Sequence, residues 1–248
     1  MLKFNYQIII EYIGKNFAGW QIQKNGKSIQ AEVEKAIGKT LKLKVNLIGS
    51  GRTDAGVNAV AQSANFVCKK KIPNNFRFIS SVNHFLRNSS ISIVNLKKKD
   101  SDFHARRSAK KRQYEYIIVN RAAKLSIDNN RAWLVKKKLN IKKMKIAIKH
   151  FLGTHDFSAF RASSCSAKNP IKTISQANIK KRGDRISLTF ISKSFLQKQV
   201  RSMVGSLKYV GEEKWSPKKI LQVIKLKKRD KCAPPAPPQG LFLKKVFY

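Results

Sequence analysis

The sequence predicts an α+β protein built from two comparable halves. Hydrophobic residues make up 42% of the 248 residues, which is enough for a sizeable core. The first half reads as strand, helix, strand, strand, helix, strand, because short β-rich apolar runs alternate with apolar stripes at helical spacing. A broadly similar order follows. We therefore expect two halves, residues 1–107 and 108–248, that share or abut one sheet and leave a cleft between them.

The first half supplies four strands and two helices. The strands are expected at Gln7–Tyr12, Val45–Ser50, Ala59–Cys68 and Ile91–Leu96. Ser28 should cap a helix whose apolar stripe is Ile29, Val33, Ile37 and Leu41. In the helix expected at Phe76–Asn88, the inward residues should be Ile79, Val82, Phe85 and Leu86. The loop after the first strand carries Phe17 and Trp20, which either fold back onto the core or contact a substrate.

The second half is less regular. Phe103–Val119 mixes basic residues with aromatics and ends as a strand, with Tyr114 and Tyr116 on one face. The remaining elements are a helix capped by Asn140 and closed by Gly153, a polar loop at 154–170, a hairpin of Ile171–Lys180 and Arg185–Ser192, a helix from Leu196 to Gly211, a helix opened by Ser216-Pro217, a stiff connector at Ala233–Pro238 and a strand at Leu241–Tyr248. Arg201 lies beside the apolar stripe of its helix, so we expect it to be half-buried and to seek a carboxylate or a phosphate.

The composition points to a polyanionic partner. The net charge is +40, which favours nucleic acid, although a chain rich in Lys, Ile and Asn also results from an A+T-biased genome. The three cysteines (Cys68, Cys165, Cys232) are far apart and form no C-x-x-C, so neither a zinc site nor a disulfide framework is expected. No apolar run is long enough to span a membrane and no signal-peptide core is visible, so we expect a cytoplasmic protein without a membrane association.

One short segment is a candidate catalytic site. Residues 49–56 read G-S-G-R-T-D-A-G, and Asp54 is the only acid between Glu34 and Asp100. Clustered glycines predict unusual backbone dihedrals or a close approach to a ligand. The segment lacks the Gly-Lys-Ser/Thr of a P-loop, and chemistry that uses two metals or two carboxylates would need further acids nearby. A zinc deaminase would need Cys and His ligands. A single carboxylate that acts at a sugar C1′ or at a base remains.

The sequence resembles the tRNA pseudouridine synthase A family over nearly its whole length. The matching segments are Glu11–Gln23 (E-Y-I-G-K-N-F-A-G-W-Q-I-Q), Ser28–Gln30 (S-I-Q), Gly51–Val57 (G-R-T-D-A-G-V), Phe103–Arg106 (F-H-A-R), Arg112–Tyr116 (R-Q-Y-E-Y), His155–Arg161 (H-D-F-S-A-F-R), Val200–Gly205 (V-R-S-M-V-G) and Gly240–Leu243 (G-L-F-L). The resemblance implies that the chain isomerises uridine to pseudouridine at positions 38, 39 and 40 of the tRNA anticodon stem-loop. It also implies the family fold, with two α+β halves around a largely antiparallel sheet and a basic central cleft, a homodimer, and no metal or organic cofactor.

The resemblance also implies roles for four residues. Asp54 matches the catalytic aspartate, a nucleophile if the route is a covalent adduct; a glycal intermediate is the alternative. Arg201 matches the arginine that pairs with this aspartate. Tyr114 matches the tyrosine that stacks on the target base, and Arg52 matches the arginine that helps to flip the nucleotide out of its stem. Flipping costs a few kcal/mol, and stacking on an aromatic ring returns roughly 1–3 kcal/mol per base.

Two departures and several simpler interpretations accompany these roles. Asn58 stands where the family usually has His, so a protonated side chain is not available there, and Gln199 stands where Met is usual. Asp54 could instead cap a turn, Tyr114 could be a core tyrosine, and Arg201 could be a surface residue. His104 and His155 are expected to be structural. A non-catalytic RNA-binding protein with the same fold is the alternative function.

Overall fold

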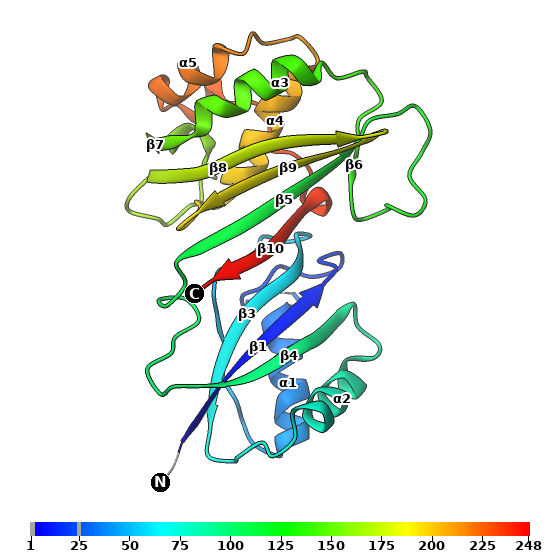
Figure 1. The fold of residues 1–248 in the computed structure, drawn as a ribbon, viewed down its shortest axis with the longest axis vertical. Coiled ribbons are helices and arrows are strands. Elements are labelled where there is room, and N and C mark those ends of the chain that lie inside the picture. The colour runs from blue at the N-terminus through cyan, green and yellow to red at the C-terminus, as the bar shows by residue number, and fades with distance from the viewer. Residues whose placement is uncertain (1–2, 24–25) are drawn as a thin grey trace. The chain divides into compact units, whose positions relative to one another are not determined.

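The computed structural model describes residues 3–23 and 26–248 (Figure 1). The chain forms two compact units. Unit 1 comprises Met1–Lys110 together with Leu243–Tyr248, and unit 2 comprises Lys111–Phe242. The C-terminal segment thus belongs with the N-terminal residues, an arrangement that the order of elements along the chain does not indicate. Both units combine helices with mostly antiparallel strands, which confirms the predicted α+β class.

Unit 1 is a sheet with two helices. Its elements are β1 (Phe4–Tyr12), α1 (Ile29–Leu41), β2 (Ile48–Gly49), β3 (Asn58–Cys68), α2 (Asn75–Leu86) and β4 (Ile91–Lys99), with β10 (Leu241–Phe247) at the end of the chain. The strand order is β4-β1-β3-β10, and β2 pairs with β3. β1 and β3 are antiparallel, so Phe4 lies opposite Cys68 at one end and Tyr12 opposite Ala59 at the other. The order strand, helix, strand, strand, helix, strand is therefore confirmed, with a second strand that is much shorter than predicted.

Helix α1 begins where its predicted cap, Ser28, places it. Ser28 Oγ accepts the N–H of Ala31 at 3.3 Å, and the whole predicted stripe of α1 is buried. In α2 the buried residues are Phe78, Val82 and Leu86, spaced four apart. The prediction that Phe85 faces inward is wrong. It lies at the edge of this narrow stripe, is 44% exposed, and has the Lys39 ammonium 5.4 Å from its ring centroid.

Unit 2 combines strands with three α-helices. Its elements are β5 (Lys111–Val119), β6 (Trp133–Leu134), α3 (Ile141–Ile148), β7 (Gly153–Asp156), β8 (Ile171–Arg182), β9 (Arg185–Ser192), α4 (Gln199–Gly211) and α5 (Lys219–Leu226). The strand order is β5-β9-β8-β7, and β6 pairs with β5 in parallel. In Figure 1, α3, α4 and α5 lie on one side of this sheet. The predicted hairpin is confirmed, with Gly183 at φ +57 in its turn.

The predicted polar loop at 154–170 is wrong in its first half. Residues Gly153–Asp156 form β7, and a short 3₁₀ helix follows at Ser158–Phe160. Phe157 and Phe160 are completely buried and lie in ring contact with each other. The sequence does not reveal this apolar pair, because the neighbouring residues are polar and a segment of one turn is too short to show a helical or strand period.

The helix predicted after Ser216 also begins later than expected. α5 starts at Lys219, and no side chain caps it. Ser216 and Pro217 form the turn before it, since their carbonyl groups accept the N–H groups of Lys219 and Ile220. The pair therefore starts a turn that leads into the helix.

Candidate active site

The candidate catalytic residue occupies a tight turn in unit 1. The N–H of Val57 donates to the carbonyl of Asp54 at 3.1 Å, and Gly56 adopts φ +75 at the third position of this turn. A positive φ at that position is the reason for a glycine. Asp54 is half-buried and Arg52 is exposed. The carboxylate and the guanidinium expected to act on the nucleotide thus come from one short segment between β2 and β3.

Thr53 joins this turn to β1 and to the loop that follows it. The hydroxyl groups of Tyr12 and Thr53 are 2.8 Å apart, and the N–H of Trp20 donates to the Thr53 carbonyl at 3.1 Å. Gly19 has φ +107, and a Cβ on it would lie 2.6 Å from the Thr53 carbonyl oxygen. Position 19 therefore requires glycine, because the backbone there approaches the backbone of Thr53 too closely for a side chain.

Asn58 fixes the other side of the turn. Its side chain is completely buried, and its Oδ1 accepts the backbone N–H of Gly14 at 2.7 Å. A Cβ on Gly14 would lie 2.2 Å from the Val57 carbonyl oxygen. A neutral amide therefore satisfies a buried backbone donor where the resemblance leads one to expect His. Buried donors without a partner are costly, so this hydrogen bond explains why a polar residue is needed at position 58.

The start of the segment packs against an aromatic ring and a polar core. A Cβ on Gly49 would lie 2.5 Å from Nε1 of Trp20, so the absence of a side chain makes room for the indole. Trp20 and Phe17 are 2% and 8% exposed, which confirms that these aromatics fold back onto the core. Ser50 donates its backbone N–H to the Ser63 carbonyl at 2.7 Å, and its hydroxyl group donates to Gln62 at 2.8 Å. All of these anchors are buried, so the turn is preorganised.

Tyr114 lies on β5 in unit 2 and is half-buried. Its ring meets the ring of Phe195 edge to face, with centroids 5.2 Å apart and planes at 87°. Phe190 is its partner in the register with β9. Edge-to-face contact holds one aromatic ring against another without covering both of its faces. This geometry suits a ring that stacks on a base.

Arg201 projects from α4, is half-buried as predicted, and is tied to the proline-rich segment. Its Nε donates to the Ala236 carbonyl at 2.7 Å, while its own carbonyl accepts the N–H of Ala236 at 2.9 Å. A Cβ on Gly205 would lie 2.0 Å from the Pro234 carbonyl oxygen. The small residues of V-R-S-M-V-G thus let this segment approach the helix, and the approach orients the guanidinium.

Tyr116 supports the same region from β5. It is completely buried and donates its hydroxyl hydrogen to the Pro237 carbonyl at 2.8 Å. Its ring fills the space that a Cβ on Gly240 would need, with the nearest ring atom 2.6 Å away. Burial raises the pKa of the Tyr116 phenol well above its ordinary value, and the positive charge of Arg201 opposes the rise only in part. Tyr116 is therefore a neutral donor whose role is structural.

The departure at Gln199 also has a structural role. Gln199 is completely buried at the first turn of α4, and its Oε1 accepts the N–H of Leu196 at 2.8 Å. Lys198, the residue before it, has φ +59. An amide here satisfies a backbone donor just before the helix, and its oxygen is a stronger acceptor than the thioether sulfur of methionine. His155 likewise makes a local contact, because its Nε2 lies 2.7 Å from the Leu152 carbonyl oxygen.

The four predicted site residues are divided between the units. Asp54 and Arg52 share the turn of unit 1, whereas Tyr114 and Arg201 belong to unit 2.

The sequence did not indicate that Tyr116 supports the proline-rich segment or that Phe195 supports Tyr114. Gly14 and Gly19 could have indicated that the loop after β1 packs against the turn of Asp54, because two glycines in one short loop indicate close backbone approach. Phe195 has no comparable signal. In the described ranges no group of three His, Cys, Asp or Glu residues could hold a metal ion.

Comparison with known proteins gives full-length matches. The family model described as tRNA pseudouridine synthase matches residues 8–112 and 147–248. A tRNA pseudouridine synthase A of Pelagibacter ubique (strain HTCC1062) is 59% identical over 245 residues, which cover 99% of this chain and 100% of that protein. The protein of the same name from Rhodopseudomonas palustris (strain BisA53) is 43% identical, with 98% of each chain covered. That of Ehrlichia chaffeensis (strain ATCC CRL-10679 / Arkansas) is 44% identical, with 98% of this chain and 99% of that protein covered.

Proposed function

This chain belongs to the tRNA pseudouridine synthase family and isomerises uridine to pseudouridine in tRNA, and we propose that it acts at positions 38, 39 and 40 of the anticodon stem-loop with Asp54 as its catalytic carboxylate. The observation that carries the assignment of Asp54 is the way its turn is held. It is the only acid between Glu34 and Asp100, and buried contacts through Thr53, Asn58 and Gly49 surround it.

The reaction requires one group to act on the glycosidic bond while the base is retained. The N1–C1′ bond breaks, the uracil turns, a C5–C1′ bond forms, and the hydrogen of C5 leaves as a proton while N1 is protonated. No oxidant or co-reactant is needed. A single carboxylate held in one geometry can act at C1′ or at the base, and the fixed turn places it without reorganisation during the reaction.

The other predicted residues have separate parts in the proposal. Tyr114 stacks on the flipped uracil, and its edge-to-face contact with Phe195 supports that orientation. Arg201 pairs with Asp54 and keeps it anionic, helped by the hydrogen bond from Arg201 Nε to the Ala236 carbonyl. Arg52 enters the stem as the nucleotide leaves it, and its exposure two residues before Asp54 makes its side chain accessible for this role.

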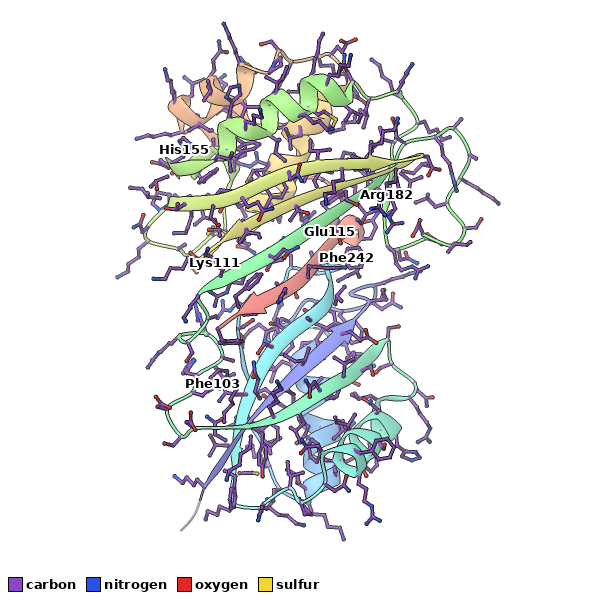
Figure 2. The ribbon with its side chains drawn as sticks, viewed as in Figure 1. Phe103, Lys111, Glu115, His155, Arg182 and Phe242 are labelled. Atoms are coloured by element: carbon purple, nitrogen blue, oxygen red, sulfur yellow. The ribbon has the colours of Figure 1, made fainter. Side chains whose placement is uncertain are left out.

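The charge of the chain suits an RNA partner. Long side chains with nitrogen tips project outward from both units in Figure 2, in keeping with 53 Lys and Arg against 13 Asp and Glu. Cationic groups that neutralise phosphates release counterions, so affinity for tRNA should fall steeply with salt. A flat salt response would mean that the excess charge reflects composition alone.

We also propose a setting for the reaction. The enzyme acts in the cytoplasm as a homodimer that binds tRNA across both subunits, as the family resemblance implies. Of the described helices, none has the length and apolarity needed to cross a membrane.

Replacing Asp54 with Asn tests the proposal. The change keeps the size of the side chain and removes the carboxylate, so release of tritium from [5-³H]uridine in unmodified tRNA should fall to background, while the affinity for tRNA stays within a few-fold. The exposed Asp100→Asn is the control, because it removes the same charge from unit 1 and should leave tritium release intact. Appreciable turnover by the Asp54 variant would refute the catalytic assignment, and wild-type protein that binds tRNA without release would indicate a non-catalytic RNA-binding protein.

A further inference from the structure

The end of unit 1 remote from Asp54 carries a cationic surface. We call it the Lys70 surface: Lys70, Lys71 and Arg77 line a hollow of about 210 Å³ between the β3–α2 connection and the end of α1. None of the residues that line the hollow is acidic. Between Asp54 and Asp100 the sequence contains no acid at all, but it contains eight Lys and Arg residues. The surface is therefore positive without local compensation.

The three cations have no intramolecular use within residues 3–23 and 26–248. The ion pairs found in these ranges involve other lysines and arginines. All three side chains are exposed. Like charges gathered around one hollow repel each other, which opposes folding slightly unless an anion occupies the hollow. A polyanion is thus the partner whose charge complements this surface.

The connection that carries the lysines is held firmly to the core. The side chain of Ile72 is buried, and its backbone N–H donates to the Tyr6 hydroxyl oxygen at 2.8 Å. Cys68 Sγ lies 3.1 Å from the Lys70 carbonyl oxygen, and Pro73 restricts the residues beside it. The backbone at Lys70 and Lys71 is therefore positioned before any ligand arrives, which lowers the entropy cost of binding.

Strand β3 separates the Lys70 surface from the catalytic turn. β3 begins at Asn58, beside the turn, and ends at Cys68, just before the lysines (Figure 1). Eleven residues of extended chain span about 30 Å, since a strand rises roughly 3.3 Å per residue. At physiological ionic strength the Debye length is about 8 Å, so these cations cannot influence the chemistry at Asp54 directly. A ligand bound at Asp54 contacts these cations only if it is long enough to reach them.

We infer that the Lys70 surface binds backbone phosphates of the substrate tRNA outside the anticodon arm. This inference rests on the proposed function, in which a uridine of the anticodon arm lies at Asp54. At roughly 3 Å per base pair, 30 Å corresponds to about ten base pairs, which exceeds the short stem of that arm. The phosphates at the Lys70 surface therefore belong to another part of the same tRNA. Contacts of this kind add affinity and position the RNA, and they carry no base specificity.

The test compares two RNAs on one triple variant. Lys70→Gln/Lys71→Gln/Arg77→Gln should raise the Kd for full-length tRNA roughly tenfold. It should also reduce the slope of log K against log salt by roughly two to three, because each of three phosphate contacts contributes about 0.7–0.9. The Kd for an isolated anticodon-arm RNA should stay within twofold. Thermal unfolding checks that the variant is folded, and the double variant Lys70→Gln/Lys71→Gln should show an intermediate loss.

A matched control separates this surface from bulk charge. Lys142→Gln/Lys145→Gln/Lys149→Gln removes the same charge from an exposed part of unit 2 and should change the Kd for full-length tRNA by less than threefold. Equal losses in both triple variants, equal losses for both RNAs, or no loss for tRNA would each overturn the inference. Failure of this inference is distinguishable from failure of the proposed function. If only the inference fails, pseudouridine still forms, but the triple variant changes the Kd values of the two RNAs alike. If only the proposed function fails, no pseudouridine forms, but the Kd values of the two RNAs still respond differently.

Discussion

The Oδ1 atom of Asn58 accepts the backbone N–H of Gly14 at 2.7 Å, in a completely buried position beside the turn that carries Asp54. This contact joins β3 to the loop after β1. It shows that position 58 serves the turn as an uncharged acceptor. The geometry behind Asp54 therefore does not depend on a protonated side chain at this position.

Asn58→Ala should destabilise the protein by about 1–3 kcal/mol, because it leaves the buried Gly14 donor without this acceptor. Urea unfolding at pH 7 measures the change, and tritium release should fall with it because the turn loses its support. The exposed Asn88→Ala should cost less than about 0.5 kcal/mol. Asn58→His should recover part of the loss at high pH, where its ring can accept; recovery that is greater at low pH would contradict the acceptor role.

Arg201→Lys separates charge from geometry. Lysine keeps the positive charge but has no Nε–H at the place where arginine donates to Ala236, so the side chain is no longer oriented by the proline-rich segment. We expect kcat to fall at least tenfold while the affinity for tRNA stays within a few-fold. An unchanged kcat would show that charge alone is sufficient. Lys198→Arg, one turn away on the exposed side, should leave both quantities unchanged.

Tyr114→Phe and Tyr116→Phe form a matched pair on one strand. If Tyr114 acts by stacking, its Phe variant should retain much of the activity, since the ring is kept; near-total loss would indicate a role for the hydroxyl group. Tyr116→Phe removes the hydrogen bond to the Pro237 carbonyl and should lower stability by about 0.5–1.5 kcal/mol. Single-turnover rates and urea unfolding of both variants distinguish the two roles.

Gly205→Ala should be strongly destabilising, because the new methyl group would lie 2.0 Å from the Pro234 carbonyl oxygen and would displace the segment that orients Arg201. Thermal unfolding and kcat should both decrease. Gly183→Ala is the control: its Cβ would meet nothing within 4 Å, so only the cost of φ +57, about 1 kcal/mol, remains. Equal effects of the two changes would argue against close packing at Gly205.

Stability should decrease in acid through Glu212. Burial acts to raise the pKa of this carboxyl group, but hydrogen bonds and charges from Lys208, at 2.7 Å, and Lys214 outweigh it, so the pKa lies below the ordinary value of 4.5. A carboxyl group with a lowered pKa stabilises the folded state above its unfolded pKa, and this contribution is lost as the pH falls through the folded pKa. Urea unfolding between pH 6 and pH 3 should show a smaller acid dependence in Glu212→Gln; an unchanged dependence would contradict this role.

The sequence by itself determined the α+β class, the helix start at Ser28, the stripe of α1 and the hairpin at Gly183, because caps, periodicity and turn residues act over a few neighbouring positions. It also singled out Asp54, since a lone acid among clustered glycines is a local pattern. Only the tertiary structure decided why those glycines are there. Gly49 accommodates Trp20, and Gly14 and Gly19 approach the Asp54 turn from a loop more than thirty residues away in the chain. The same holds for Asn58, because its partner Gly14 lies 44 residues away in the chain and no local pattern encodes such a contact.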